Sequence, residues 1–368
     1  MILQKENNFF SKSYVIFLFS ILLALISSSV SFSQHGEFGS VSGTILDNSS
    51  GKPLSNVNVY VAHSTIGTTT NAEGKFLIRQ IPVGIVRIIV SSIGYQIQTE
   101  KVRIKANHKN ELNFGLDKKI YQLPTVIVDS EDAARWQRNY EIFFAAFVGT
   151  SDNADECTIQ DPYDLDFSRN DDGTLLATVT KPIEIINKAL GYKITYFLES
   201  FRHFERSTKF NGSPVFEELK PADKTEEKKW ERNRIKTYRG SLRHFLYAAS
   251  RDYDNFLKTG KNQNGNDTSK TLLEREGFSV MSVRKVDVGF KKYEIYSKLS
   301  TPGFIYLSPE PNEKILSFPD RIQVTYLREK EDEKYLRFIG VFRDPVWQQS
   351  IIKLHSVAVK FNSRGYYF

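Results

Sequence analysis

The chain has 368 residues, 40% of them hydrophobic and 13% aromatic, so it is long enough for two or more domains with substantial cores. Its 50 Lys and Arg residues against 43 Asp and Glu residues give a formal charge of +7, which is mild for this length and does not indicate a nucleic-acid-binding protein. A single cysteine, Cys157, excludes an internal disulfide and any multi-cysteine zinc or iron–sulfur site.

Residues 1–33 have the features of a secretory signal peptide. Lys5 and Lys12 precede an apolar run over residues 14–26, and Ser31 and Ser33 supply the small residues that a signal peptidase reads. The run is shorter than the ~20 residues that cross a bilayer, which disfavours a retained anchor. No cysteine follows the cleavage point, so we expect no lipid anchor. We therefore expect an exported protein, in the periplasm or associated with the outer membrane.

Residues 34–117 show the pattern of a β-sandwich. Val57, Val59 and Val61 alternate with polar neighbours, as on a strand with one buried face. Similar runs occur at residues 67–78, 85–93 and 97–104, and turns rich in glycine and proline separate them. About seven short strands at this spacing predict a sandwich, with Phe76 and Tyr95 in its core.

The same segment contains a recognisable string of residues: Gly43-Thr44-Ile45-Leu46-Asp47, Gly51-Lys52-Pro53-Leu54 and Gly67-Thr68-Thr69-Thr70-Asn71-Ala72-Glu73-Gly74-Lys75-Phe76. It closely resembles the carboxypeptidase-like regulatory domain, a transthyretin-like β-sandwich. In known families this domain lies beside peptidase domains and at the N-termini of TonB-dependent outer-membrane receptors. The resemblance implies an accessory or interaction module without catalytic residues.

Residues 118–129 are predicted to be a connector, followed by a helix. Ser130 is a suitable N-cap, and Glu131 and Asp132 favour the first turn. Gly149 suits the stop. The aromatic side chains of this helix fall on one stripe: Trp136, Tyr140, Phe143, Phe144 and Phe147. Such a stripe suits a carbohydrate or partner platform, but packing against a sheet in the second domain's core is the favoured interpretation.

Residues 130–368 are predicted to form an α+β domain with a mostly antiparallel sheet and a few helices. Strands and turns are predicted over 157–167, 175–179, 183–186 and 189–198. Further strand runs are predicted at 278–283, 293–299, 304–307, 322–327, 336–342 and 356–361. The strings at residues 187–194 and 238–246 resemble a family of exported Bacteroidota proteins with the same N-terminal domain. That resemblance implies no established activity.

Residues 221–252 are predicted to be helical, with a break or bend at Gly240. One expected stripe contains Ile235, Tyr238, Leu242, Phe245, Leu246 and Ala249. The region is also basic, with Lys228, Lys229, Arg232, Arg234, Lys236, Arg239 and Arg243 among Trp230 and Tyr238. Export disfavours nucleic acid as the partner. We expect a solvated helix face, with peripheral contact to an anionic membrane surface as the alternative. Residues 258–270 are predicted to be a polar loop or a disordered insertion.

One pattern allows a zinc site, because His108-Lys109-Asn110-Glu111 has His-x-x-Glu spacing and His203 or His244 is available as a third ligand. The motif lies in a polar turn before the last predicted strand of the sandwich, residues 112–116, and chance spacing is the favoured explanation. We expect one or two histidines to pack against aromatic rings.

Two other groups of residues were considered as sites. Acidic groups at Asp171-Asp172 and at Asp152 with Asp155 allow calcium, but residues 170–173 are typical of a hairpin turn. We expect Cys157 to be a buried, inert thiol, since no cation or histidine flanks it. The sequence shows neither a Gly-x-Ser-x-Gly elbow nor a phosphate-binding glycine loop. We therefore predict no catalytic, cofactor-binding or metal-binding residues.

These observations predict a non-catalytic accessory or binding module of the cell envelope that engages an envelope protein, a peptide or a glycan. A sandwich edge strand is one place where an extended peptide could pair. One alternative is a hydrolase related to zinc metallocarboxypeptidases. Another is a small outer-membrane protein, suggested by the terminal Gly365-Tyr366-Tyr367-Phe368, although charges such as Lys291 and Arg328 interrupt the apolar face of a barrel. The oligomeric state stays open.

Overall fold

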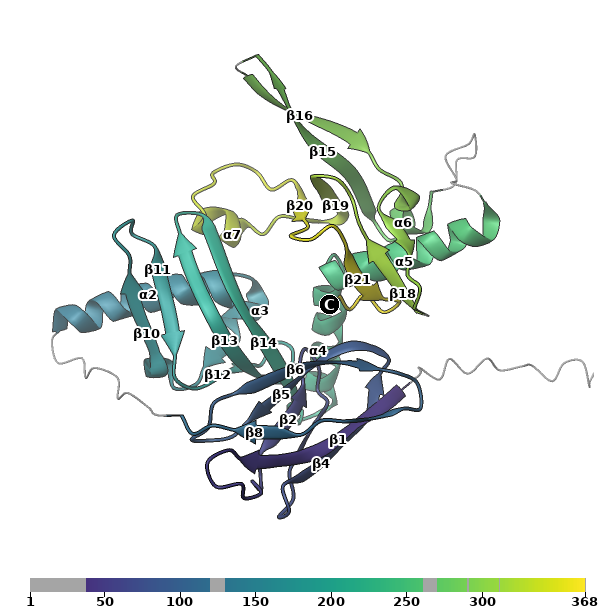
Figure 1. Cartoon of the computed structure of the whole chain (residues 1–368). Helices are drawn as coiled ribbons and strands as arrows, with labels where there is room; N and C mark the ends of the chain where they lie inside the picture. Colours follow the sequence, from purple (N-terminus) through teal and green to yellow (C-terminus); the bar gives the residue numbers. More distant parts are fainter. Residues whose placement is uncertain (1–37, 120–129, 261–269, 290, 311, 368) are drawn as a thin grey trace, which may run out of the picture. The chain divides into compact units, whose positions relative to one another are not determined.

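The computed structural model describes residues 38–119, 130–260, 270–289, 291–310 and 312–367 (Figure 1). The predicted signal peptide, most of the predicted connector and most of the predicted loop at residues 258–270 lie outside these residues. Strand is the commonest element of the described chain, and the strands form several sheets with a few helices, which confirms the predicted fold class.

The N-terminal part is a sandwich of two four-stranded sheets. In the first sheet, β1 (Phe38–Asp47) pairs with β4 (Lys75–Pro82), β7 (Lys109–Glu111) and β8 (Phe114–Leu116). The second sheet has the order β3 (Gly67–Thr69), β2 (Asn58–Val61), β5 (Gly84–Ser91) and β6 (Gln98–Ile104). Alternating aliphatic residues fill the space between them, among them Val41, Ile45, Val57, Val59 and Ile88.

The sandwich has eight strands where the sequence predicted seven, because the chain that runs parallel to β1 is interrupted between β7 and β8. At the interruption, the Asn113 side-chain oxygen accepts a hydrogen bond from the Thr44 N–H at 2.8 Å. Gly43 lies directly beside it, where a Cβ atom would stand 1.6 Å from the Leu112 carbonyl oxygen. Only glycine allows the two chain segments to approach this closely.

The next part is a six-stranded antiparallel sheet covered by a helix. Its strands are β9 (Cys157–Ile159), β10 (Leu165–Arg169), β11 (Leu175–Val179), β12 (Ile183–Asn187), β13 (Tyr192–Phe204) and β14 (Ser207–Glu218). Helix α2 (Ser130–Phe147) packs against it, and Phe143 is fully buried next to Phe201 with ring centroids 4.7 Å apart. The aromatic stripe of this helix is therefore core, as predicted. Short turns follow at α3 (Asp152–Asp155) and η1 (Pro162–Asp164).

Two helices lead to the last part of the chain. α4 (Lys224–Tyr238) and α5 (Leu242–Thr259) are separated by the predicted bend, where Gly240 has φ +79°. After α6 (Leu272–Arg275) come a four-stranded sheet, β16 (Lys291–Lys298), β15 (Phe278–Val288), β19 (Arg321–Lys330) and β20 (Trp347–Lys353), and a three-stranded sheet, β17 (Ile305–Leu307), β18 (Glu313–Leu316) and β21 (Val359–Asn362). Element η2 (Thr301–Gly303) precedes β17. α5 buries Phe245, Leu246 and Ala249 against both sheets.

Three predictions about this last part were wrong or incomplete. Residues 336–342, expected as a strand, belong to α7 (Glu333–Phe338) and the turn after it, because the Asp332 carboxylate caps the helix by accepting the Tyr335 N–H at 2.7 Å. Ile235 and Leu242, which were expected on a buried stripe, are exposed. Strands β18 and β20 were not predicted, and neither was β14 of the preceding sheet.

The sandwich packs against the hairpin β13–β14. Ala62 and Ile89 of the sandwich form one buried cluster with Phe197 and Val215. The backbone continues the contact, since the His63 N–H donates to the Pro214 carbonyl at 2.7 Å and the Phe216 N–H donates to the Ser64 carbonyl at 3.0 Å.

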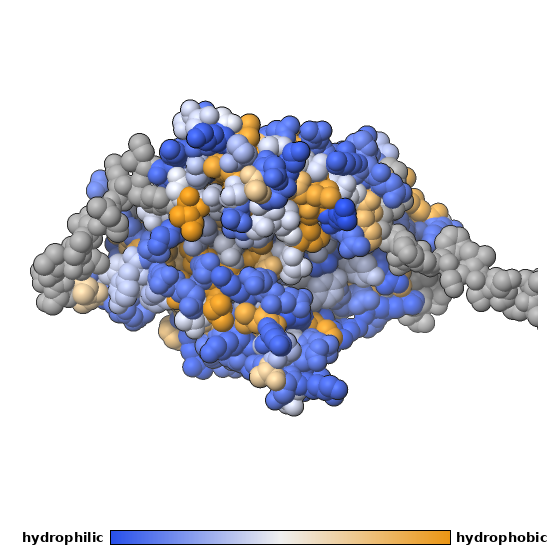
Figure 2. Space-filling view, turned by 90° about the horizontal axis from the view of Figure 1, so that it is seen from below, coloured by the Kyte–Doolittle hydropathy of each residue, from blue (hydrophilic) through white to orange (hydrophobic). Residues whose placement is uncertain are grey.

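Figure 2 shows one face of the molecule, on which hydrophobic residues lie in small groups among hydrophilic ones. In the part of the chain that the structure describes, none of the helices has the length and apolar character needed to cross a membrane.

Candidate functional site

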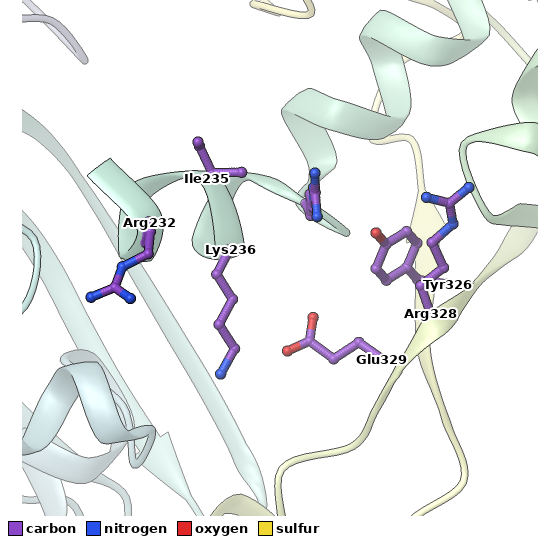
Figure 3. A pocket seen from close by; sticks show the side chains of 7 residues that line it. Arg232, Ile235, Lys236, Tyr326, Arg328 and Glu329 are labelled. Atoms are coloured by element: carbon purple, nitrogen blue, oxygen red, sulfur yellow. The ribbon is translucent and has the colours of Figure 1, made fainter. Parts of the chain in front are cut away.

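An open groove of about 400 Å³ lies between α4 and β19 (Figure 3). Four of the residues that line it are cationic: Arg232, Lys236, Arg239 and Arg328. The other lining residues are Ile235, Tyr326 and Glu329. The groove therefore combines positive charge with an apolar side chain, an aromatic ring and a single acid.

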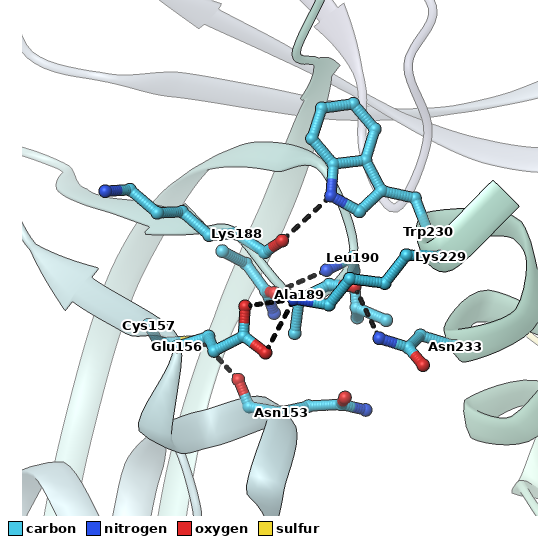
Figure 4. Close-up of polar contacts among 10 residues, drawn as sticks. Asn153, Glu156, Cys157, Lys188, Ala189, Leu190, Lys229, Trp230 and Asn233 are labelled. Atoms are coloured by element: carbon cyan, nitrogen blue, oxygen red, sulfur yellow. Dashed lines mark hydrogen bonds and ion pairs between the residues drawn. The ribbon is translucent and has the colours of Figure 1, made fainter. Parts of the chain in front are cut away.

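The wall formed by α4 is fixed to the turn between β12 and β13 by side chains that donate to backbone carbonyls (Figure 4). Trp230 Nε1 donates to the Lys188 carbonyl at 2.8 Å, and Asn233 Nδ2 donates to the Ala189 carbonyl at 2.9 Å. Lys229 Nζ pairs with the Glu156 carboxylate at 2.7 Å. These contacts hold α4 against the sheet, so its cationic side faces the groove from a fixed position.

The opposite wall is β19, whose Tyr326 is buried against α5 and β15. Its ring lies 5.0 Å from that of Phe278 and 6.1 Å from that of His244, measured between centroids. The Gly240 bend passes so close that an added Cβ would stand 2.8 Å from the Tyr326 ring. The bend between the helices thus brings the C-terminal end of α4 to the strand.

The cations of the groove are not held in ion pairs by the residues that the structure describes. Among the described residues, none of Arg232, Lys236, Arg239 and Arg328 forms an ion pair, although the guanidinium of Arg328 donates to the Arg275 carbonyl. In Figure 3 the Lys236 amine and the Glu329 carboxylate extend toward the same space from opposite walls. An unpaired group of cations around a hollow leaves its charge for a ligand.

The chemistry of the groove suits an anion that also carries hydroxyl groups. Guanidinium groups donate paired N–H bonds that match the oxygens of phosphate and carboxylate. Burial raises the pKa of the Tyr326 phenol, so its hydroxyl stays protonated at neutral pH. The Glu329 carboxylate is able to accept hydrogen bonds from the hydroxyl groups of such a ligand.

The residues of the hypothetical zinc site do not come together. His108 lies in the turn between β6 and β7 and Glu111 on β7, whereas His203 is on β13 and His244 on α5. Within the described ranges, no three side chains of His, Cys, Asp and Glu are grouped so as to hold a metal ion. Of the acidic residues considered for calcium, Asp152 and Asp155 both pair with the Lys334 amine, at 2.9 and 2.7 Å.

Two histidines pack against aromatic rings, as predicted. His203 lies 5.9 Å from the Phe338 ring. His244, which is 5% exposed, contacts Tyr238 and Phe278. Its Nδ1 accepts the Gly240 N–H at 3.1 Å, which leaves Nε2 to face Glu276 at 3.4 Å. Burial lowers the pKa of His244, against the opposing effect of Glu276.

Cys157 is half-buried at the start of β9, and its thiol lies 3.4 Å from the Asn153 carbonyl oxygen (Figure 4). Burial, followed by the charge of Glu156, raises the pKa of the thiol to about 11. A thiol that stays protonated at neutral pH is a poor nucleophile.

The acidic residues at 171–172 lie in the turn between β10 and β11, as expected for a hairpin. The Asp172 side chain accepts the Thr174 N–H at 2.9 Å. This carboxylate is therefore used to close the turn.

Sequence reasoning found one wall of the groove and missed the other. The basic residues of α4 are visible in the sequence, which favours a solvated helix face for them. Tyr326, Arg328 and Glu329 lie about 90 positions later, and only the fold brings them to Lys236. The available signal was the sequence Tyr326-Leu327-Arg328-Glu329, which places a cation and an acid next to a buried aromatic residue at the end of a strand.

Comparison with protein families finds that residues 41–128 match the CarboxypepD_reg-like domain. The predicted resemblance to the carboxypeptidase-like regulatory domain is confirmed for this segment. The match covers less than half of the chain, so it assigns a domain and not the whole protein. The likenesses to TonB-dependent receptors and to exported Bacteroidota proteins stay predictions. Comparison with curated proteins finds no relative.

Among solved structures, the chain is similar to 3-chlorocatechol 1,2-dioxygenase from Rhodococcus opacus 1CP, at 15% identity over 24% of this chain and 62% of that one, with a TM-score of 0.19. It is similar to the minor pilin GBS52 of Streptococcus agalactiae, at 16% identity over 24% and 48%, with a TM-score of 0.20. A Bacteroides fragilis protein described as membrane-associated and of unknown function matches at 16% identity over 44% and 65%, with a TM-score of 0.19. In each case the chain spans under two thirds of the other protein. None of these likenesses carries an argument about function.

Proposed function

We propose that this protein is an exported, non-catalytic binding module of the cell envelope whose groove holds an anionic glycan. The observation that carries the proposal is the set of four cations around one hollow, none of which forms an ion pair with a residue that the structure describes. A regulatory-like domain at residues 41–128 is compatible with an accessory role. The signal-like residues 1–33 support export to the periplasm or the outer membrane.

The ligand class follows from the lining side chains. Arg239 and Arg328 suit a phosphate or carboxylate group, and Glu329 suits a sugar hydroxyl. A fully acidic polymer without hydroxyl groups would meet the repulsion of Glu329, whereas a neutral sugar would leave the cations unused. A phosphate-bearing sugar uses both kinds of group.

The test is a titration of the full mature chain with three probes: glucose, inorganic phosphate and glucose 1,6-bisphosphate. We expect the bisphosphate to bind more tightly than either of the others, because it alone pairs with cations at both ends and offers hydroxyl groups between. Removing two groove charges in Lys236→Gln/Arg239→Gln should weaken its binding at least tenfold, since hydrogen bonds to charged groups are worth about 1.5–3 kcal/mol each.

The matched control is Lys224→Gln/Lys228→Gln, which removes the same charge from α4 at exposed positions that do not line the groove. This control should change the binding by less than threefold. Equal losses in the two variants would show that the charge of the helix acts diffusely and would reject the groove as a site. Tighter binding of inorganic phosphate than of the bisphosphate would reject a glycan as the ligand.

A protein or peptide partner would bind at a different place, the exposed edge of the sandwich. β6 ends its sheet, and Thr99, Glu100 and Lys101 on it are exposed. An extended segment that pairs with this edge would be displaced by a proline at Glu100, and binding that survives Glu100→Pro would exclude the edge.

A further inference from the structure

The β15–β16 hairpin extends past the sheet that supports it. β19 pairs with β15 only as far as Val283, whereas β16 continues alongside β15 beyond that residue (Figure 1). Residues 284–288 and 291–295 therefore form a ribbon of two strands. Every residue of β16 is exposed. An isolated two-stranded ribbon is only marginally stable in water, so contact with another surface would stabilise this one.

The register separates the ribbon into two unlike faces. Arg284 is opposite Ile295, and Val286 is opposite Tyr293. With Lys291, two positions before Tyr293, these residues lie on one face, here called the apolar ribbon face. It continues the side of β15 that packs under α5 through Phe278 and Val280.

The opposite side, here called the charged ribbon face, holds Lys285 opposite Glu294 and Asp287 opposite Lys292. Glu294 accepts from the Arg321 guanidinium at 2.5 Å and from the Tyr296 hydroxyl at 2.8 Å. Acids and cations alternate here, so this face satisfies much of its own charge.

The apolar ribbon face has no acid. Tyr293 is 49% exposed and Ile295 is 50% exposed. Arg284 and Lys291 are also exposed, and among the described residues neither forms an ion pair. The face thus offers half-exposed apolar groups flanked by two unpaired cations.

We propose that the apolar ribbon face docks on an anionic lipid surface. Tyrosine and isoleucine insert at the level of lipid headgroups, while Arg and Lys stems lie along the apolar boundary and their charges meet anionic headgroups. A second copy is disfavoured as the occupant, because Arg284 and Lys291 would then face like charges with no acid to pair with. Charge complementarity therefore selects an anionic membrane surface.

The test is flotation of the full mature chain with vesicles of phosphatidylcholine alone and of phosphatidylcholine with phosphatidylglycerol. We expect binding to the anionic vesicles only. Arg284→Gln/Lys291→Gln should reduce the partition coefficient about thirtyfold, following the contribution of each basic residue near an anionic surface. Tyr293→Ser/Ile295→Ser should reduce it at least tenfold through lost apolar burial.

The matched control is Lys285→Gln/Lys292→Gln, which removes the same charge from the charged ribbon face and should reduce binding by less than threefold. Equal losses in the two charge pairs would overturn the proposal, and so would binding that the serine pair leaves unchanged. Light scattering without vesicles tests whether the apolar ribbon face instead binds a second copy of the chain. A wild-type dimer that becomes monomeric in the serine pair would show that the face binds a second copy and would reject the lipid surface.

Discussion

Residues 38–116 and residues 130–367 contain two contrasting uses of polar side chains. In the sandwich, the buried Asp47 carboxylate accepts hydrogen bonds from the Ser49 hydroxyl at 2.5 Å and the Tyr95 hydroxyl at 2.8 Å. These bonds, that of Ser49 foremost, hold the pKa of Asp47 well below its usual range. In the second part, the groove and the apolar ribbon face present cations that form no ion pair within the described ranges.

The difference indicates where binding chemistry is to be sought. A side chain whose hydrogen bonds are satisfied internally contributes to the fold, whereas an unpaired cation beside an apolar group is available to a ligand. The family match lies almost entirely in the sandwich. The groove and the apolar ribbon face lie in the second part of the chain. The first domain, which the family match identifies, therefore contains neither of these two candidate binding surfaces.

The largest expected effect is on the stability of the sandwich. Gly43→Ala places a Cβ against the Leu112 carbonyl, and we expect a loss of about 3 kcal/mol or more in the free energy of unfolding, because rigid backbone on both sides must move. The measurement is chemical denaturation of the full chain, followed by circular dichroism. Gly51→Ala is the control, since its added Cβ meets nothing within 4 Å and only the left-handed backbone costs about 1–2 kcal/mol. Equal losses in the two variants would contradict the close approach.

A smaller effect is expected for Gly191→Ala, which tests the groove while leaving the sandwich unchanged. The new Cβ would stand 2.2 Å from the Trp230 indole, which is held by its bond to the Lys188 carbonyl. We expect α4 to shift, with a loss of about 1–3 kcal/mol.

Binding of glucose 1,6-bisphosphate should weaken in the Gly191 variant, while hydrogen exchange in the sandwich stays unchanged. Gly173→Ala also has a left-handed backbone but meets no atom within 4 Å, so it should leave binding intact. Retained binding in the Gly191 variant would contradict the role of Trp230 in placing the groove.

The smallest effect concerns pH. Burial lowers the pKa of His244 in the folded protein below the ~6.5 of the unfolded chain. The unfolded chain then binds more protons between these two pKa values, so stability is lost as the pH falls through 6.5 toward the folded pKa.

All three tryptophans, Trp136, Trp230 and Trp347, lie outside the sandwich, so their fluorescence monitors melting of the second part. We expect that melting temperature to fall between pH 7 and 5.5, and to fall less in His244→Gln. The pKa values of His63 and His203 are lowered too, so the wild-type slope belongs to all three histidines and the variant measures the share of His244. An unchanged slope in the variant would assign it to the other two.

The sequence was sufficient wherever a local pattern decides the structure. The alternation of Val57, Val59 and Val61 and the stripe around Phe143 each predicted an element and its buried side. β14 escaped prediction because Gly212 and Pro214 interrupt its pattern, and its strand geometry comes from pairing with β13 along its whole length. A tertiary partner there overrides a weak local signal.

The candidate sites depended on information that no local pattern contains. The groove joins Lys236 to Glu329 across two helices and several strands, and no spacing in the sequence announces that approach. The ribbon is different, since Tyr293 and Ile295 alternate visibly with charges. Which of those residues share a face with Arg284 becomes known only from the register of β15 and β16.

The buried cluster of Ala62, Ile89, Phe197 and Val215 has a practical consequence for anyone who wishes to produce the first domain alone. A polypeptide ending at Asp117 would leave Ile89 open to water and the His63 N–H without its acceptor. Exposed apolar surface and an unpaired backbone N–H together favour self-association. The excised domain would therefore be a poor reagent for finding partners, since what it captured would include whatever substitutes for its own missing hairpin.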